Sequence, residues 1–478
     1  MKPITFLLFF CAFVYAGYSQ PVLQHLLNDP ALKHASVGVC VTDLNTGKEV
    51  LRHDAEKSLT PASTLKLITT ATALELFGEN YRYKTDIALD TADPSRILVL
   101  GSGDPTLGSE AFGNNPNAFF TYITEALKNV LPGDNAYSIY VVDNLFGYDG
   151  ISPEWTWIDI GNYYASGAYG ISIFDNSYKI VFDTSDRNIP PRILRTEPEI
   201  KGLTFVNHLS LNNSGRDNGY IYGTPFSYEK TLKGDIPAGK SRFSIKGDIP
   251  DPGLLLGQTL AEYMTRAGYR IEKVETARQD YLLRFPNRNK PLAYSVGNVL
   301  CTQTSRPLKE IIREINVTSN NHYTEHLIRT LGRNQAPDIY ADALQEGIDF
   351  VNDYWRQKGI STSSLTMYDG CGLAPQNAVS PAFLNQMLYY MYTQSRYADA
   401  FYQSLPQAGK DGTLTNFMQG TKNGNSIHAK SGSIGGVQCY SGYLIDKNKK
   451  YAFTIMVNTF NGTRSQVKSA IERFLSTL

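Results

Sequence analysis

The chain has 478 residues, 42% of them hydrophobic, and its 45 basic and 45 acidic side chains give a formal net charge of zero. A chain of this length does not fold around one compact core, so two or three domains are expected. The neutral balance gives no reason to expect nucleic acid or an anionic membrane surface as a partner.

The first residues have the pattern of an export signal. Lys2 precedes an apolar run from Ile4 to Ala16, which is too short for a comfortable membrane span and is followed by small and polar residues. Cleavage is expected near Ser19, so residues 1–19 are assigned to a signal peptide. We therefore expect a mature protein that crosses the inner membrane into the periplasm, with peripheral association with the cell wall or membrane left open.

The N-terminal part predicts a helix, a hairpin and a second helix. Residues 21–33 have helical character, and two short apolar runs flank the turn Asn45-Thr46-Gly47. Thr60 and Pro61 are typical of a helix start, and Gly78 is typical of the position just after a helix end.

The C-terminal part predicts two helices, three strands and a final helix. Together with the N-terminal elements they favour an α+β domain built from both ends of the chain. The predicted ranges are Pro307–Ile315, His322–Leu331, Ile427–Lys430, Gly442–Ile445, Tyr451–Val457 and Ser465–Leu478.

About 250 residues separate Lys66 from Ser319, far more than a direct connection needs. We therefore predict an inserted α/β domain with a small β domain nested inside it. The predicted boundaries are 20–82 plus 290–478 for the main domain, 83–202 plus 249–289 for the insertion, and 203–248 for the nested β domain.

A serine and a lysine three residues apart open the second predicted helix. Ser63 and Lys66 would share one helical face, where an unprotonated lysine can take the proton that makes serine a nucleophile. Burial or a second cation, such as Lys430, would lower the lysine pKa as this requires. A surface serine and lysine is the alternative, and Ser465 and Lys468 repeat the spacing near the C-terminus.

Two further short motifs follow in a fixed order. Ser319 and Asn321 lie between two predicted helices and offer a hydroxyl and a carboxamide, for proton relay and substrate anchoring or for helix capping. Lys430, Ser431 and Gly432 lie on a predicted strand, where they can receive a substrate backbone and a terminal carboxylate or form an ordinary edge.

The three motifs in this order resemble those of the penicillin-binding D-alanyl-D-alanine carboxypeptidase/endopeptidase family with a large insertion between the first two motifs. Supporting segments are Thr60–Thr70, Gly101–Leu107, Ile315–Asn321, Asp369–Leu373 and Tyr440–Tyr443. The resemblance implies a penicillin-binding, β-lactamase-like transpeptidase domain with inserted domains. It also implies cleavage of peptidoglycan stem peptides and cross-links, inhibition by β-lactam antibiotics, and no cofactor or metal.

The resemblance also implies roles for single residues. Ser63 would be acylated with Lys66 as its base, Ser319 and Asn321 would form the second motif, and Lys430 with Ser431 and Gly432 would bind the substrate carboxylate and backbone. The backbone N–H of Ser433 would complete an oxyanion hole. In the insertion, Asp159 would bind the ammonium group of the stem peptide's diamino acid, and Tyr164 would form an aromatic wall beside it.

The chain departs from the family pattern at a few positions. Ser431 replaces the usual threonine and keeps its hydroxyl, whereas Cys371 stands at a usual serine and its role is open. Pro375 and Gly435 stand where some members carry an arginine and a glutamine, so weaker recognition of the side chain's own carboxylate is expected.

Some of these residues also match the patterns of other functions. His322, Glu325 and His326 match the zinc-peptidase pattern HxxEH, but no downstream glutamate motif accompanies them. A serine β-lactamase or an esterase of the same fold would share the acylation step, yet no segment supplies the glutamate that class A enzymes use for deacylation. The intact motifs argue against a catalytically silent wall-binding protein.

Overall fold

The computed structural model describes residues 21–113, 115–284 and 294–478, and the predicted signal peptide lies outside these ranges. The chain forms two compact units, which we call the first and the second unit. The first consists of Met1–Tyr81, Pro307–Asn320 and Ile348–Leu478, and the second of Arg82–Arg306 and Asn321–Gly347.

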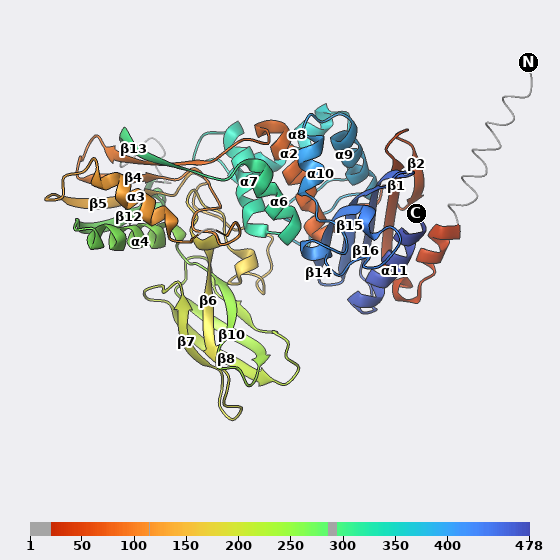
Figure 1. The fold of residues 1–478 in the computed structure, drawn as a ribbon, viewed down its shortest axis with the longest axis horizontal. Coiled ribbons are helices and arrows are strands. Elements are labelled where there is room, and N and C mark those ends of the chain that lie inside the picture. The colour runs from red at the N-terminus through yellow and green to blue at the C-terminus, as the bar shows by residue number, and fades with distance from the viewer. Residues whose placement is uncertain (1–20, 114, 285–293) are drawn as a thin grey trace, which may run out of the picture. The chain divides into compact units, whose positions relative to one another are not determined.

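The first unit is built on a five-stranded antiparallel sheet to which both ends of the chain contribute. Figure 1 shows the red N-terminal strands beside the blue C-terminal strands. The predicted α+β fold from both chain ends is therefore confirmed. In spatial order the strands are β14 (Ile427–Ile434), β15 (Val437–Ile445), β16 (Lys450–Asn458), β1 (Ser36–Asp43) and β2 (Glu49–His53).

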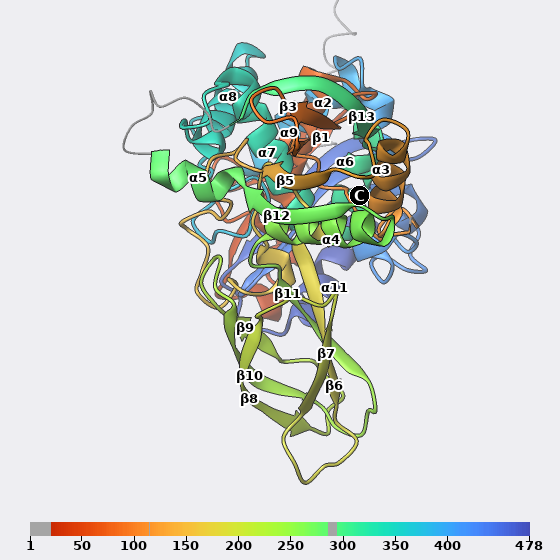
Figure 2. The same cartoon turned by 90° about the vertical axis from the view of Figure 1, so that its left-hand side faces the viewer.

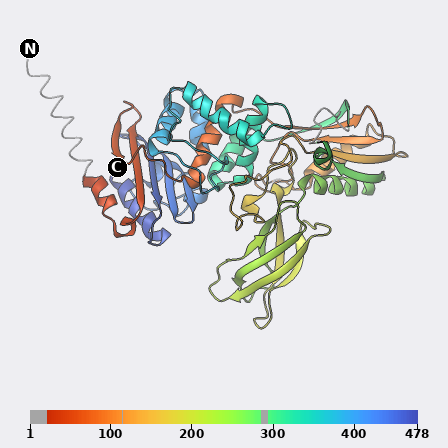
Figure 3. The same ribbon diagram turned by 180° about the vertical axis from the view of Figure 1, so that it is seen from behind.

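Helices cover both faces of this sheet. Successive side chains of a strand point to opposite faces, so neighbouring residues of β1 pack into different cores. Val39 and Val41 of β1 belong to a core that also holds Leu26 and, from α11 (Arg464–Thr477), Ile471. The residue between the two valines, Cys40, packs instead with residues near the start of α9 (Pro381–Thr393). Figure 3 shows the blue C-terminal helix α11 beside the red segment that contains η1 (Pro30–Leu32).

The helix predicted after Thr60 exists, but it begins differently. A short 3-10 turn, η2 (Ala62–Leu65), leads into α2 (Lys66–Phe77), and Thr60 donates its hydroxyl to Pro375 O at 3.3 Å instead of capping the turn. The predicted Gly78 does follow the helix, with a φ of 81° that favours glycine. The two helices predicted around the second motif are α6 (Leu308–Thr318) and α7 (Asn321–Gln335).

The second unit has a five-stranded mixed sheet with a helical layer. Two helices, α3 (Ala118–Lys128) and α4 (Pro252–Arg266), contribute Phe120, Ile123 and Leu256 to the apolar core of this unit. Figure 2 shows α4 running along β12 and β5. In spatial order the strands are β12 (Arg270–Thr276), β5 (Ala136–Val142), β4 (Arg96–Leu100), β3 (Lys84–Asp90) and β13 (Val296–Thr304).

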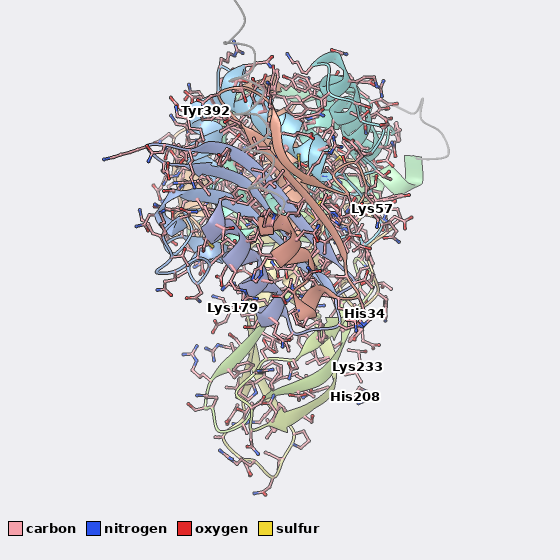
Figure 4. All side chains as sticks on the ribbon, turned by 90° about the vertical axis from the view of Figure 1, so that its right-hand side faces the viewer. His34, Lys57, Lys179, His208, Lys233 and Tyr392 are labelled. Carbon is pink, nitrogen blue, oxygen red and sulfur yellow. The ribbon has the colours of Figure 1, made fainter. Side chains whose placement is uncertain are left out.

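Two small three-stranded sheets complete the second unit. The first contains β8 (Thr204–Asn212), β10 (Glu229–Pro237) and β9 (Tyr220–Tyr222), and the second contains β11 (Phe243–Asp248), β6 (Ser177–Asp183) and β7 (Arg192–Glu197). His208 and Lys233, labelled in Figure 4, are opposite residues of the parallel strands β8 and β10.

The predicted domain boundaries differ from these units in two places. The prediction kept all residues from 290 onward in the main domain, whereas β13 pairs with β3 in the second unit, which also includes Asn321–Gly347. Within the predicted nested β domain, β11 pairs with β6, which lies outside the predicted range. The β13–β3 and β11–β6 pairings join distant segments, which local sequence patterns do not specify.

Among the described helices, none is both long enough and apolar enough to cross a bilayer. The four cysteines of the described residues are all free, and Cys40, Cys371 and Cys439 are fully buried. Cys40 and Cys439 lie in apolar strand sequences, where a buried free thiol is the expected state.

Asp104, in the loop after β4, should make stability pH-dependent. Its Oδ1 accepts from Thr106 N and Oγ1 at 2.8 and 2.6 Å, while burial raises the pKa of the carboxyl from 3.8 to about 6. Because the pKa of Asp104 is higher in the folded state than in the unfolded state, ionisation of its carboxyl destabilises the folded protein. This destabilisation is absent below pH 3.8, where the carboxyl is protonated in both states, and complete above pH 6. Asp104→Asn should thus raise the free energy of unfolding by up to about 3 kcal/mol at pH 8 and little at pH 4.

Denaturant titrations at the two pH values measure this difference, with the exposed Asp134→Asn as control. Equal changes at pH 4 and pH 8 would contradict the assignment.

Candidate active site

Ser63 and Lys66 lie one helical turn apart where η2 passes into α2. The backbone enters this turn through Ala62, whose φ is 45°. Lys66 is fully buried, and its Nζ lies 2.9 Å from Ser63 Oγ. The structure thus brings together the predicted nucleophile and the predicted base at hydrogen-bonding distance, which is the geometry that proton transfer requires.

A second contact holds the Lys66 amine in place. Lys66 Nζ donates to the backbone oxygen of Cys371 at 2.6 Å. The loop that presents this oxygen is organised by the buried Asp369, whose carboxylate accepts from the backbone N–H of Gly372 at 2.7 Å and of Ala374 at 2.7 Å. Sequence reasoning left the role of Cys371 open and missed Asp369, because a carbonyl contact leaves no side-chain signature.

Gly372 lets this loop close onto the turn that carries Ser63. Its φ is 83°, and a Cβ at this position would lie 1.9 Å from Ala62 O. No larger residue fits without moving the backbone. The D-G-x-G pattern of residues 369–372 was the available signal for this role.

Ser319 and Lys430 form a second pair in the first unit. Ser319 follows α6 in a left-handed conformation, with a φ of 63°, so it ends a helix and does not cap the start of one. The fully buried Lys430 donates to Ser319 Oγ at 2.9 Å and to Ser431 O at 2.8 Å. Burial, and secondarily the charge of Lys66, holds the pKa of Lys430 well below its ordinary value.

The strand β14 approaches the Ser63 turn at Gly432. A Cβ on Gly432 would lie 2.4 Å from Pro61 O and 3.1 Å from Ser63 N. Next to it, Ser431 donates its hydroxyl to Thr413 Oγ1 at 2.9 Å. Thr413 is a further hydroxyl at this strand, and the sequence patterns gave no reason to select it.

Ser433 lies farther along β14, opposite Gln438 of β15, and its side chain is exposed. Its role as an oxyanion donor stays a prediction.

The remaining predicted site residues lie in the second unit, where they contact one another. Asn321, the first residue of α7, donates its amide to Tyr164 O at 2.8 Å. Asp159 accepts hydrogen bonds from Tyr164 OH at 3.1 Å and from Thr156 Oγ1 at 2.5 Å. Burial, and next the Asp159 carboxylate, raises the pKa of Tyr164, so its hydroxyl stays protonated and donates to Asp159.

The histidines of the HxxEH pattern are buried in the second unit. Their ring nitrogens lie 2.8 to 3.5 Å from Ser166, Ser172 and the backbone oxygen of Gly103. The glutamate of the pattern, Glu325, forms a 2.6 Å ion pair with Arg329. Contacts with protein groups thus account for the pattern, and a zinc site at His322 and His326 receives no support.

Comparisons with known proteins show which family the chain resembles over nearly its whole length. A family model described as the D-Ala-D-Ala carboxypeptidase 3 (S13) family matches residues 19–478. A D-alanyl-D-alanine carboxypeptidase of Actinomadura sp. (strain R39) is 27% identical over 459 residues, which cover 92% of this chain and 81% of that protein.

The fold also matches solved structures. The crystal structure of penicillin binding protein 4 from Haemophilus influenzae superposes with a TM-score of 0.77 at 17% identity, covering 96% of this chain and 98% of that one. A complex of the same protein with a β-lactam gives a TM-score of 0.73 at 16% identity, covering 95% and 98%. The chain therefore has the β-lactamase-like transpeptidase fold with additional small β sheets.

The close approach at Gly432 predicts a strong effect of one methyl group. Gly432→Ala should lower the rate of Ser63 acylation by a β-lactam about a hundredfold or more, because the added Cβ displaces either β14 or the Ser63 turn. Gly435→Ala is the matched control in the same hairpin, since its Cβ would meet nothing within 4 Å. Mass spectrometry over time measures both rates, and equal rates would show that the contact does not set the site geometry.

Proposed function

The chain belongs to the D-Ala-D-Ala carboxypeptidase 3 (S13) family, and we propose that it removes the terminal D-alanine of peptidoglycan stem peptides through an acyl-enzyme on Ser63. We propose that the same site also hydrolyses D,D-cross-links, because they present the same acyl group. The observation that carries the proposal is the 2.9 Å contact between Lys66 Nζ and Ser63 Oγ in a buried position.

In the acylation step, the Lys66 amine takes the hydroxyl proton as Ser63 Oγ attacks the carbonyl of the penultimate D-alanine. The C–N bond to the terminal residue then breaks, and the proton passes to the leaving amine. Ser319, whose Oγ accepts from Lys430 Nζ at 2.9 Å, would relay that proton. A water molecule next attacks the ester carbon, Ser63 recovers its proton, and the shortened peptide leaves.

The negative oxygen formed during attack needs donors. Ser63 lies in the first turn of its helical segment, where backbone N–H groups lack intrahelical partners. With the N–H of Ser433 as the second donor, the site would hold the oxygen between two amides, each contributing roughly 3 kcal/mol.

The terminal carboxylate of the substrate would bind at β14. Ser431 and Thr413 present two hydroxyls 2.9 Å apart, and Lys430, whose Nζ donates to Ser431 O at 2.8 Å, would add a positive charge when protonated. Hydroxyl groups and an ammonium suit a carboxylate. In this arrangement Lys430 serves both the carboxylate and the Ser319 relay.

β-Lactams would act as inhibitors because their ring carbonyl is an acyl donor of the same kind. A penicillin binding protein of the same fold has been solved with a β-lactam bound. A serine β-lactamase is the second candidate, and the lifetime of the adduct separates it from a carboxypeptidase.

The proposed setting is the periplasm, with peptidoglycan as partner and without nucleic acid. Its support is the apolar run after Lys2 and the zero net charge.

The direct test is mass spectrometry of the protein after exposure to benzylpenicillin. We expect one lasting adduct on Ser63, no adduct in Ser63→Ala, and acylation slowed about a thousandfold or more in Lys66→Ala. Ser465→Ala, in the second S-x-x-K pattern, should be labelled like wild type. An adduct on another serine would overturn the proposed nucleophile, and rapid turnover of the drug would favour the β-lactamase.

Asp159 should decide between stem peptides with different side chains. Its carboxylate, held by Tyr164 and Thr156, suits an ammonium group, so kcat/KM should be higher for a peptide with a free side-chain amine than for its N-acetylated form. Asp159→Asn should reduce this preference about tenfold. The control substitution Asp149→Asn, at an exposed carboxylate, should leave the preference unchanged. An equal kcat/KM for both peptides in wild type would mean that Asp159 does not read the side chain.

A further inference from the structure

Two buried histidines of α7 share one serine hydroxyl. His322 and His326 lie one helical turn apart, with 4.5 Å between their ring centroids. Ser172 Oγ is 3.2 Å from His322 Nε2 and 2.8 Å from His326 Nε2. The proposed mechanism gives none of these three side chains a role.

One backbone carbonyl fixes the direction of every hydrogen bond in this group. Gly103 O only accepts, so His326 Nδ1, 2.9 Å away, carries the ring proton, and Nε2 of this neutral ring is an acceptor. Ser172 must therefore donate to His326 and accept from His322 Nε2–H. His322 Nδ1 is then an acceptor, and Ser166 Oγ lies 3.5 Å from it and 3.5 Å from the backbone oxygen of Asp175.

The neutral state that this assignment requires agrees with the environment of the rings. Burial lowers the pKa of His322 to about 3 and holds that of His326 well below its ordinary value. The group is thus a one-way chain of hydrogen bonds from His322 through Ser172 and His326 to Gly103.

The chain of hydrogen bonds lies where α7 meets the segment formed by residues 164–176, which begins with Tyr164. Asn321, one residue before His322, donates to Tyr164 O at 2.8 Å. Tyr323 donates to Asp175 Oδ1, near the end of the same segment, at 3.1 Å. Three successive residues at the start of α7 therefore each bond to residues 164–176.

The far end of this segment is itself a strained turn. Phe174, Asp175 and Asn176 have φ values of 55°, 57° and 47°, in the left-handed region that residues other than glycine rarely adopt. The amide of Asn176 holds them by donating to Gly167 O at 2.9 Å and accepting from Ile173 N at 3.1 Å. Strain of this kind persists only where the surroundings fix the backbone, and it is concentrated at functional sites.

We propose that His322, His326 and Ser172 are positioning residues that fix the Asn321 carboxamide relative to Tyr164. They act through Asn321 and touch neither substrate nor reacting atoms. The inference rests on the proposed function and on the sequence-based prediction that Asn321 anchors the substrate and Tyr164 forms a wall beside its side chain.

The first test is the tautomeric state of the two rings. Protein labelled with ¹⁵N-histidine contains seven histidines, and the His322→Gln and His326→Gln variants assign the two signals. We expect neutral rings at pH 7, protonated at Nε2 in His322 and at Nδ1 in His326. A charged ring, or the opposite tautomer at either position, would overturn the chain.

The second test separates positioning from general stability. Ser172→Ala should lower the second-order rate of Ser63 acylation by benzylpenicillin about tenfold, because both histidines lose their shared partner. Thr184→Val is the control, since it removes a buried hydroxyl that donates to Pro237 O elsewhere in the second unit, and its rate should change less than twofold. Equal rates in the two variants would overturn the proposal.

A third comparison applies even where Ser172→Ala fails to fold. In His322→Gln the amide nitrogen can replace Nε2–H and donate to Ser172, whereas His322→Leu cannot donate. The Gln variant should stay within about threefold of wild type and the Leu variant should lose about tenfold, and equal losses would contradict positioning. Failure of the proposed function would look different, because the wild type would form no Ser63 adduct while the tautomers would stay as assigned.

Discussion

The burial of two lysine amines in one unit is the constraint on which the site depends. Lys66 and Lys430 are both fully buried, and each repels the other's charged form. A buried ammonium is costly unless it is hydrogen-bonded, so each amine needs fixed partners. Lys66 has Ser63 Oγ and Cys371 O, and Lys430 has Ser319 Oγ and Ser431 O. Two of these partners, Ser63 Oγ and Ser319 Oγ, are the hydroxyl groups of the proposed mechanism.

Much of the first unit serves to hold these partners together. Lys430 lies on β14, in a sheet that joins strands from both ends of the chain, and Ser319 depends on a left-handed turn after α6. Asp369 closes the loop that aims Cys371 O at Lys66, and Gly372 and Gly432 allow backbone to approach the Ser63 turn. The fold of the first unit therefore determines the geometry of the site, and the glycines near Ser63 are part of that geometry.

Local patterns predicted the parts of the structure that depend on local spacing. Ser63 and Lys66 are three residues apart at the start of a helix, so their contact could be predicted, and a strand was predicted at Ile427–Lys430. The contacts of Cys371 and Thr413 could not, because they join distant segments through a backbone oxygen and a common hydroxyl. The same reason explains β13, whose place beside β3 depends on a partner about 200 residues away.

The central claim is that Ser63, activated by Lys66, attacks a D-alanyl carbonyl. The most direct measurement is a crystal structure with a peptide boronic acid that mimics the D-Ala-D-Ala terminus and carries boron in place of the reacting carbonyl carbon. We expect a covalent bond from boron to Ser63 Oγ, Lys66 Nζ within hydrogen-bonding distance of that oxygen, and a boronate oxygen between the N–H groups of Ser63 and Ser433. Boron bound to another residue, or Lys66 displaced from Ser63 in the complex, would contradict it.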